Sequence, residues 1–489
     1  MNAVRPKLRW LADEAINNII AEARRVLAEI GVFVENRTAA ELLLDCGCRR
    51  SADQKRIVIG DTLIDRALST APPCVRLYDR DGIEAMTLAD DNVHFNPGSA
   101  ALHVYDAERN VIRDGVTADL VSFATLTDLL PHYAAQSTGI IPSDIPEDLG
   151  DRFRLFIALQ AAKKPVVTGT FRVDGFAVMK DMMVAIRGSE QALAQKPLAI
   201  FDCCPSPPLK WSDLTCQSLL DCADSGLPAE LVSMPLTGAT APVTLAGALV
   251  QHTAENLSGV VIHQLRKPGA PIVYGGSPAF FDMRKGTTPM GAFETMMIDG
   301  AYAQIGKHLG LPTHAYMGLS DSKMVDYQAG FETSAGIVLA ALSGINNVSG
   351  PGMMEFESCQ SLEKLVLDHE VCGYAKRLVE GITLRDDPLA IGVLIEGLQA
   401  GHFMSLPHTL KWFRREGYYP DAVVNRDVKE KWAAGGRKDA LEGARERVAK
   451  LLRDGIPNLL DGPRRNDLRK IIAADAKRHG IDKLPELTF

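Results

Sequence analysis

Charged side chains that could take part in chemistry gather in and around the segment Gly318–Lys323. Asp321 could contact a bound ligand or exchange a proton with it. Lys323 could hold a carboxylate group, or form a Schiff base with a carbonyl compound. Arg284, at the end of the segment Gly275–Arg284, could bind a carboxylate as well. Asp326 directly precedes an apolar helical pattern, and we expect it to cap that helix.

Aromatic side chains stand at or just after the ends of several predicted strands. They are Phe95, Tyr274, Phe280, Tyr316, Tyr327 and Phe356. The face of an aromatic ring attracts a permanent cation, so a group of such rings could form a cation site. Tyr274 and Tyr316 end neighbouring strands, and we expect their rings to form two walls of one pocket. The alternative for all six is ordinary packing in a core.

Two histidines and two cysteines complete the set of candidates. His402 and His408 lie six residues apart among apolar residues, and a structural or lid role is the favoured interpretation. Cys203 and Cys204 are adjacent and are therefore poor partners for one metal ion. No Cys-x-x-Cys or His-x-x-x-His pair accompanies them, so we predict no metal site.

The elements that must position these residues recur as short apolar runs separated by helical segments. We predict strands at Val93–Phe95, His132–Ala135, Val166–Thr168, Leu198–Phe201, Leu231–Met234, Ile272–Tyr274, Thr313–Tyr316 and Ile345–Val348. Their starts are roughly 32 to 41 residues apart, a normal length for one strand-plus-helix unit. Eight such units predict a (β/α)8 barrel, an α/β fold whose active site lies at the C-terminal ends of the strands.

The same pattern divides the chain into three regions. Residues 1–90 are predicted to form a helical N-terminal leader packing on the barrel, residues 91–380 the barrel itself, and residues 381–489 a helical C-terminal appendage. A polar hairpin is expected at Tyr105–Asp114, and one charged, solvated helix at Lys429–Arg453.

Composition excludes several classes of function. The 489 residues are 46% hydrophobic and 23% charged, which is ordinary for a globular protein with a large core. The net charge of -8 argues against a nucleic-acid partner, because phosphate binding needs clustered positive charge. Nine scattered cysteines favour reduced thiols in the cytoplasm. No apolar run reaches the ~18 residues that a membrane span needs, so we expect no membrane association.

Longer motifs resemble those of the trimethylamine methyltransferase family. They are Met234–Val250, Tyr274–Pro278 with Asp282–Arg284, Gly318–Lys323 followed by Asp326 and Gln328–Gly330, Ser349–Gly352 with Phe356–Lys364, and Gly401–Phe403 with His408. Their order and their coverage of nearly the whole chain carry the resemblance. It implies a (β/α)8 barrel that moves a methyl group from a methylated amine to the Co(I) corrinoid of a separate corrinoid-binding protein. No tightly bound cofactor is implied.

One departure from the family bears on the substrate. The trimethylamine enzymes carry pyrrolysine, whereas this chain has ordinary amino acids throughout, the corresponding position falling near Ser320–Gln328. The family also includes a glycine betaine methyltransferase without pyrrolysine, so the resemblance favours a quaternary amine as donor. Such a nitrogen has no proton to remove, and the protein need only position its methyl group. We take as candidate catalytic residues Asp321, Lys323 and Gln328, and as candidate substrate-binding residues Phe95, Tyr274, Tyr316, Tyr327, Phe356 and Arg284.

Three alternatives stay open at this point. The donor could be trimethylamine or another methylamine. The chain could be a different barrel enzyme, such as a Schiff-base lyase acting through Lys323. It could also be a non-catalytic homologue that binds quaternary amines. The expected partners are a corrinoid-binding protein and a small methylated amine, and we allow for a homo-oligomer.

Overall fold

Eight parallel strands form a sheet that curves into a barrel in the computed structural model, which describes residues 4–485 and 487. The strands are β6 (His94–Asn96), β9 (Gln136–Ser137), β10 (Val166–Gly169), β11 (Ala199–Cys203), β13 (Ala229–Leu231), β15 (Ile272–Gly276), β17 (Thr313–Tyr316) and β18 (Asn347–Ser349). They are hydrogen-bonded in the order β6-β18-β17-β15-β13-β11-β10-β9. A single parallel bridge between Phe95 and Tyr133 brings the two edges together, so the predicted (β/α)8 barrel is confirmed.

The second strand begins later than the sequence predicted. Residues 132–135 were expected, but the ladder with β10 starts at Gln136, opposite Val166. Gln136 is polar and therefore falls outside the apolar run. Its side chain is nevertheless fully buried, and its amide donates to the carbonyl of Ala124 at 2.8 Å.

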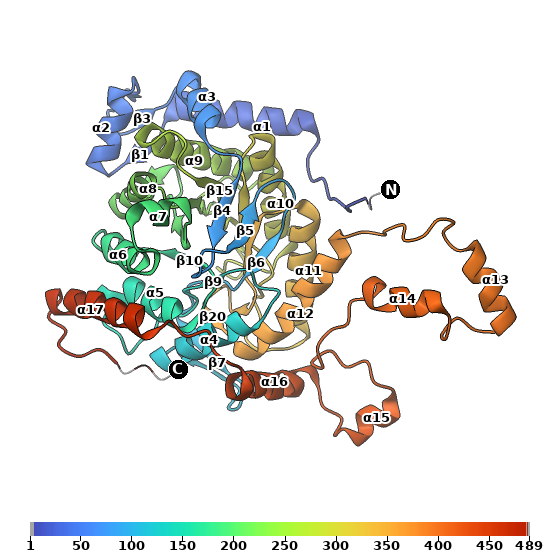
Figure 1. Ribbon diagram of the computed structural model, residues 1–489. Coiled ribbons are helices and arrows are strands. Elements are labelled where there is room, and N and C mark those ends of the chain that lie inside the picture. Colours follow the sequence, from blue (N-terminus) through green and yellow to red (C-terminus); the bar gives the residue numbers. More distant parts are fainter. Residues whose placement is uncertain (1–3, 486, 488–489) are drawn as a thin grey trace.

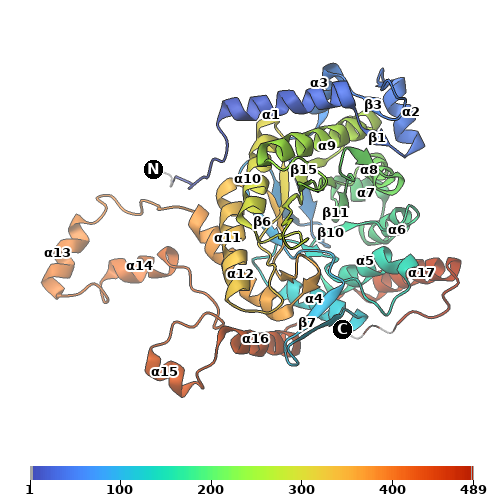
Figure 2. The same ribbon diagram turned by 180° about the vertical axis from the view of Figure 1, so that it is seen from behind.

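A helix follows each barrel strand and covers its outer face (Figures 1 and 2). These helices are α4 (Thr117–Leu129), α5 (Gly150–Ala161), α6 (Gly175–Arg187), α8 (Asp213–Ser225), α9 (Leu245–Arg266), α10 (Phe293–His308), α11 (Tyr327–Ser343) and α12 (Leu362–Val379). A short helix, α7 (Glu190–Gln195), extends the connection after α6. Because each helix returns to the start of the next strand, all strands point the same way and their C-terminal ends share one face.

The N-terminal region is not wholly helical. It contains α1 (Asp13–Arg25), a π-helical turn (Val26–Ile30), α2 (Arg37–Asp45) and α3 (Asp61–Thr70), with short strands β1 (Phe33–Val34), β2 (Arg49–Arg50) and β3 (Ile57–Val58). β1 pairs with β12 (Lys210–Trp211), which lies after β11. Helix α1 lies along α9 in both views.

A hairpin of β4 (Val75–Tyr78) and β5 (Glu84–Leu88) closes the N-terminal end of the barrel. Its alternating apolar residues, Val75, Leu77, Met86 and Leu88, are buried in one cluster with Val167 and Val273 of the barrel strands. The cluster fills the barrel interior at its N-terminal end.

Two small sheets lie at the C-terminal ends of the barrel strands. β7 (His103–Asp106) and β8 (Val111–Asp114) form the expected hairpin, which joins β19 (Met353–Met354) and β20 (Cys359–Gln360) in a four-stranded sheet. β14 (Leu236–Thr237) pairs with β16 (Ala279–Phe280). These pairs tie together loops that follow different barrel strands.

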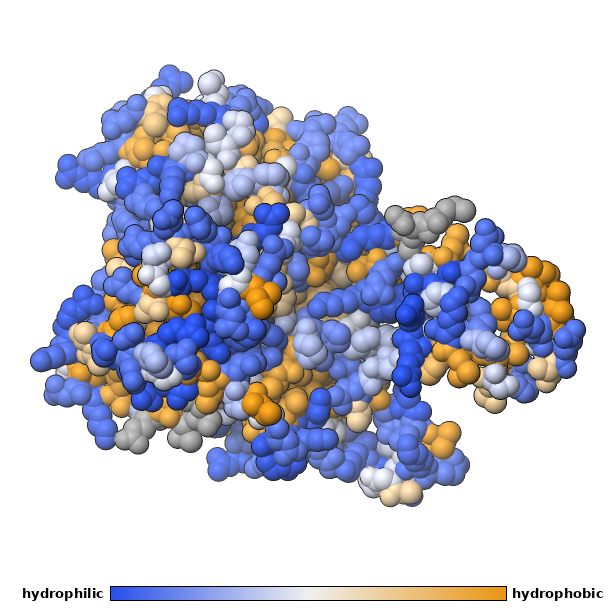
Figure 3. Space-filling view, viewed as in Figure 1, coloured by the Kyte–Doolittle hydropathy of each residue, from blue (hydrophilic) through white to orange (hydrophobic). Residues whose placement is uncertain are grey.

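The C-terminal region consists of α13 (Ile391–Ala400), α14 (Pro407–Glu416), α15 (Lys429–Ala434), α16 (Ala440–Asp454) and α17 (Gly462–Arg478). α16 packs on α12 and α4, and α17 packs on α6 and α5. α13 and α14 project from the body (Figure 1), and apolar side chains of the projecting arm remain exposed (Figure 3), among them Ile391, Ile395 and Leu398. The single helix predicted over Lys429–Arg453 is wrong, because Gly435 and Gly436 separate α15 from α16.

Within the described residues, every helix is too short or too polar to cross a membrane.

Candidate active site

A cavity of about 360 Å³ opens at the C-terminal ends of the barrel strands. Its walls come from the loops after β6, β10, β11, β13 and β15, from the end of β17, from helices α5 and α8, and from the segment after β19. The volume lies within the range of ligand pockets in proteins. The residues that give it chemical character are Arg154, Phe171, Asp202, Tyr316, Phe356 and Glu357.

Arg154 places a positive charge in the cavity wall. It is on α5 and only 2% exposed, and its guanidinium stacks over the ring of Phe171 at 4.6 Å. One nitrogen, Nη2, donates to Thr138 Oγ1 at 2.5 Å. Among the described residues, its Nε and Nη1 atoms have no hydrogen-bond partner. Burial lowers the pKa of Arg154 to about 10, so the group is still charged at neutral pH.

Two carboxyl groups face the same cavity. Asp202 is the next-to-last residue of β11, and its Oδ2 atom accepts a hydrogen bond from the Tyr316 hydroxyl at 3.1 Å. Glu357 lies in the segment between β19 and β20. Burial raises the pKa of Asp202, and burial together with the charge of Asp202 raises the pKa of Glu357 well above its usual value. The charged form of a buried carboxyl group is stabilised when a cation lies beside it.

The segment that carries Phe356 and Glu357 has an unusual backbone. Glu355, Phe356 and Glu357 have φ angles of 50°, 55° and 71°, in the left-handed region that residues with side chains rarely adopt. The amide of Glu355 donates to the carbonyl of Ser322 at 3.0 Å, and the Lys323 ammonium lies 3.8 Å from the centre of the Phe356 ring. Such strain occurs most often where a side chain is held in place for a ligand.

The three candidate catalytic residues lie beside the cavity rather than in its wall. Asp321 is buried and accepts hydrogen bonds from the amides of Met290 and Gly291, and burial raises its pKa to about 6. Lys323 donates to the Asp321 carbonyl at 2.7 Å. Gln328 donates to Glu332 at 2.9 Å. These contacts organise the loop after β17, and their catalytic role stays a prediction.

Asp326 caps α11, as the sequence predicted, because its carboxylate accepts from the amide of Ala329 at 3.0 Å.

The candidate aromatic residues separate into two groups. Tyr316 and Phe356 line the cavity. Tyr274 does not, which corrects the expectation that it shares a pocket with Tyr316. Its ring points outward from β15, where its hydroxyl donates to Thr253 at 3.1 Å and the ring lies 6.3 Å from that of Tyr302. Tyr327, at the start of α11, is 86% exposed.

The remaining candidates also lie away from the mouth. Arg284 is exposed and forms a two-point ion pair with Asp282 at 3.0–3.1 Å, so its charge is already partnered. Phe280 pairs with Thr237 across the β14–β16 sheet. His408 lies 3.3 Å from Asp386 in the projecting arm, and His402 is exposed there.

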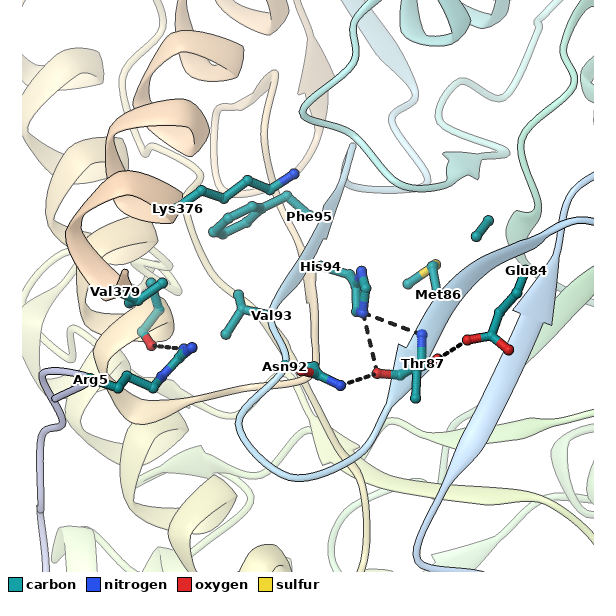
Figure 4. Close-up of a pocket in the computed structure, with 12 residues that line it drawn as sticks. Arg5, Glu84, Met86, Thr87, Asn92, Val93, His94, Phe95, Lys376 and Val379 are labelled. Carbon is teal, nitrogen blue, oxygen red and sulfur yellow. Dashed lines mark hydrogen bonds between the residues drawn. The ribbon is translucent and has the colours of Figure 1, made fainter. Parts of the chain in front are cut away.

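A second cavity, of about 470 Å³, lies at the N-terminal end of β6 (Figure 4). Arg5, the β4–β5 hairpin, β6 and the end of α12 enclose it, and Phe95 lies in its wall. His94 hydrogen-bonds to the backbone of Thr87 at 3.2–3.3 Å, and this contact holds the β4–β5 hairpin against β6. Because barrel enzymes work at the C-terminal ends of their strands, we take the smaller cavity at the mouth as the candidate site.

Arg154, Asp202 and Glu357 were not among the residues singled out from the sequence. Arg154 and Asp202 each carry a signal that could have found them, a charged residue inside an apolar run: Phe153-Arg154-Leu155 in α5 and Phe201-Asp202-Cys203 in β11. Ionised side chains are rarely buried without a partner or a function.

Residues 1–480 match the profile of a protein family described as trimethylamine methyltransferase (MTTB). The chain belongs to the trimethylamine methyltransferase family. The family and the class of enzyme predicted from the sequence motifs are thereby confirmed.

Relatives from bacteria and archaea cover almost the whole chain. The trimethylamine methyltransferase MttB of Desulfitobacterium hafniense is 28% identical, over 97% of this chain and 95% of its own. The glycine betaine methyltransferase of the same species is 27% identical, over 98% of this chain and 100% of its own. The MttB2 protein of Methanosarcina mazei is 31% identical over 91% of both chains. The solved structure of the Methanosarcina barkeri monomethylamine methyltransferase MtmB is similar with a TM-score of 0.47 and 13% identity, covering 91% of this chain and 94% of that one.

Proposed function

We propose that this methyltransferase takes a methyl group from a zwitterionic quaternary amine, of which glycine betaine is the simplest, and passes it to the reduced corrinoid of a separate protein. The observation that carries the proposal is the arrangement of charges in the cavity. A buried guanidinium with two unpartnered nitrogens shares the cavity with two half-buried carboxyl groups and three aromatic rings. The cavity is thus built to hold a positive and a negative group at once.

The negative end of the donor is assigned to Arg154. A carboxylate can accept from Nη1 of this guanidinium, and from the second hydrogen of Nη2 on the same edge, and such charge-assisted bonds are the strong ones. Phe171 covers one face of the guanidinium and keeps water from it.

The positive end is assigned to Tyr316, Phe356 and the carboxylate of Asp202. A quaternary nitrogen offers no hydrogen-bond donor, so ring faces and nearby negative charge are the means left to bind it. Tyr316 is held in place by its hydrogen bond to Asp202, and Phe356 by the strained segment around it. With both ends fixed, one N-methyl group is held toward the open mouth.

The corrinoid would supply the nucleophile that accepts the methyl group, so the chain itself needs none. The rim of the mouth suits a large partner with an apolar face. Exposed apolar side chains occur in the loops after four different strands, or at the start of the helix that follows: Phe171, Met234, Val243, Met283, Phe293 and Met324. Contiguous exposed apolar side chains are typical of an interaction surface.

The competing interpretations have less support. Lys323, the candidate for Schiff-base chemistry, donates to a backbone carbonyl and lies over one face of the Phe356 ring. Trimethylamine lacks a carboxylate and would leave the two unpartnered nitrogens of Arg154 buried without a hydrogen-bond acceptor. A homo-oligomer, suggested by the exposed arm, stays a prediction.

A spectroscopic assay tests the proposal. Purified protein is mixed with a reduced corrinoid-binding protein of this enzyme class and one donor at a time: glycine betaine, longer betaines, tetramethylammonium and trimethylamine. We expect the absorbance of the reduced corrinoid to give way to that of the methylated form fastest with a betaine. The proposal is wrong if trimethylamine methylates the corrinoid faster than every zwitterionic donor.

A further inference from the structure

The guanidinium of Arg154 is held by a threonine at the C-terminal end of the barrel wall. Thr138 follows β9 directly, and its backbone amide donates to the carbonyl of Val167 in β10 at 3.2 Å. This bond continues the register of the two strands and sets Thr138 beside Thr168. Both threonine side chains are fully buried, and their hydroxyl oxygens lie 3.1 Å apart.

Strand alternation turns both hydroxyl groups toward the helices outside the barrel. Val167 packs in the cluster inside the barrel, so the next residue, Thr168, points to the outer side of the sheet. Gln136, two residues before Thr138, bonds to a backbone carbonyl of α4 and therefore points outward too. Thr138 shares that orientation, and Arg154 of α5 meets it there, with Nη2 2.5 Å from Oγ1.

The chemistry of these groups fixes the direction of the hydrogen bonds. A guanidinium has donors only, so Arg154 donates and Thr138 Oγ1 accepts. The hydroxyl group of Thr138 keeps its own hydrogen, which Thr168 Oγ1 can accept. Thr138 thus takes one of the two hydrogens of Nη2. The other hydrogen of Nη2, together with Nη1 and Nε, stays available to a ligand.

The contact with a hydroxyl group leaves the positive charge of Arg154 without a counter-charge. Arg152, two residues earlier on the same helix, shows the opposite arrangement, because its guanidinium nitrogens lie 2.9–3.4 Å from three carboxylate groups. These groups belong to Asp151, Asp174 and Asp475. Over the residues that the structure describes, no carboxylate forms an ion pair with Arg154, and Thr138 is its one hydrogen-bond partner. Arg152 therefore holds the fold together, whereas Arg154 keeps its charge for a ligand.

The other side chain that holds Arg154 is uncharged as well. The ring of Phe171 lies 4.6 Å from the guanidinium. The backbone amide of Phe171 donates to Asp151 Oδ2 at 2.8 Å, which fixes the loop after β10. A hydroxyl group and a ring face thus orient the guanidinium, and neither carries a negative charge.

We propose that Thr138 is the positioning residue of the carboxylate site, and that its neutral hydroxyl group, oriented by Thr168, aims Arg154 at the carboxylate of the donor without neutralising it. The inference rests on the proposed function and adds the means by which the site selects a zwitterion. A carboxylate in place of Thr138 would form an ion pair with Arg154, and the donor would then compete with a group of its own kind. With a hydroxyl group there, the charge-assisted hydrogen bonds of the guanidinium remain unmade until the donor binds.

Two variants of nearly the same shape test whether the contact must be neutral. Thr138→Asn and Thr138→Asp both offer an oxygen atom to Arg154, but only the second adds a negative charge. Calorimetry on the isolated variants measures the binding of glycine betaine and of tetramethylammonium, which has no carboxylate. We expect the Kd for glycine betaine to be at least ~10-fold higher in Thr138→Asp than in Thr138→Asn, because the internal carboxylate occupies the guanidinium. The Kd for tetramethylammonium should not rise. Equal Kd values for betaine in the two variants, or a rise shared by tetramethylammonium, would overturn the inference.

A second pair of variants tests the positioning itself. Thr138→Val keeps the shape and loses the oxygen atom, whereas Thr138→Ser keeps the hydroxyl group. The Kd for betaine should rise at least ~10-fold in Thr138→Val and less than ~3-fold in Thr138→Ser, with tetramethylammonium spared in both, since one hydrogen bond to a charged group is lost only in the first. Unchanged or tighter betaine binding by Thr138→Val contradicts the positioning role.

The matched control is Thr127→Val. Thr127 is another fully buried threonine, and its hydroxyl group donates to the carbonyl of Phe123 within α4, so its loss should leave both affinities within ~2-fold. If no Thr138 variant folds, Thr168→Val decides the matter, because it removes the acceptor that orients Thr138 and leaves the contact with Arg154 in place. It should weaken betaine binding at least ~3-fold and spare tetramethylammonium, and equal effects on both ligands would contradict the inference. Failure of the proposed function gives a different result, namely a parent protein that does not bind glycine betaine.

Discussion

Arg154 is the residue whose replacement discriminates most sharply between a zwitterion site and any other site at the mouth. In Arg154→Met the side chain keeps much of its length but loses its charge and the N–H groups of its two unpartnered nitrogens. A hydrogen bond to a charged group is worth about 1.5–3 kcal/mol, so losing two of them weakens carboxylate binding by roughly 3 kcal/mol or more. Each 1.4 kcal/mol is about tenfold in affinity, and the Kd for glycine betaine should rise at least ~100-fold.

The matched control is Arg284→Met, at the arginine that the sequence suggested for the same task. Arg284 is exposed and already paired with Asp282, so its loss should change the Kd by less than about 2-fold. Calorimetry on the isolated protein measures both variants with glycine betaine and with tetramethylammonium, which has no carboxylate. Arg154→Met should spare tetramethylammonium. Equal losses for both ligands, or a large loss in Arg284→Met, would refute the assignment.

The same substitution carries a prediction about stability. Arg154 is buried with one hydrogen bond to Thr138, and a buried charge without full hydrogen bonding is destabilising. Replacing it by an apolar side chain of similar length should leave the melting temperature unchanged or raise it. A fall of more than ~1 kcal/mol in unfolding free energy would mean that Arg154 is chiefly structural.

Three further predictions follow from the same geometry. Tyr316→Leu should lower the affinity for a quaternary amine at least ~10-fold and spare a neutral carbon isostere, because a desolvated cation–π contact is worth ~2 kcal/mol; equal losses for both ligands would count against it. Tyr274→Leu should leave both affinities unchanged but destabilise the fold by about 1–3 kcal/mol in urea unfolding, since the ring packs outside the barrel. Burial lowers the pKa of three histidines, His252, His263 and His314, to about 3. Each is neutral in the folded state, whereas in the unfolded state it takes up a proton below pH ~6.5. The free energy of unfolding should therefore fall as the pH falls from ~6.5 toward 3, by about 1.4 kcal/mol per pH unit for each histidine. Urea unfolding at pH 7.5, 6 and 5 checks this, and constant stability would contradict it.

The barrel could be predicted from the sequence because its strands are short apolar runs at regular intervals. The direction in which each side chain points could not be predicted from the sequence. Parallel strands in a barrel are buried on both faces, so inward and outward positions are equally apolar. Tyr316 ends β17 as predicted, whereas β15 continues for two residues beyond Tyr274. The ring of Tyr274 lies outside the barrel and that of Tyr316 inside, because their positions differ in the alternation along the strand.

The site was harder to predict than the fold for a second reason. The barrel fold directs attention to the loops after the strands, and Asp321 and Lys323 lie in such a loop. Arg154 instead belongs to a helix and enters the cavity from the side, beneath the loop after β10. Asp202, which lines the same cavity, lies within strand β11. A chain read in one dimension gives no sign that a helix residue and a strand residue share a cavity.

A competition experiment measures the central claim most directly. Glycine betaine labelled with ¹³C in its N-methyl groups is mixed with an equal concentration of unlabelled trimethylamine, the protein and a reduced corrinoid-binding protein, and the label on the corrinoid methyl group is determined. The account predicts at least ~10-fold more labelled than unlabelled methyl groups, since the carboxylate contact with Arg154 is worth more than 1.4 kcal/mol. Methyl groups that come mainly from trimethylamine would contradict it.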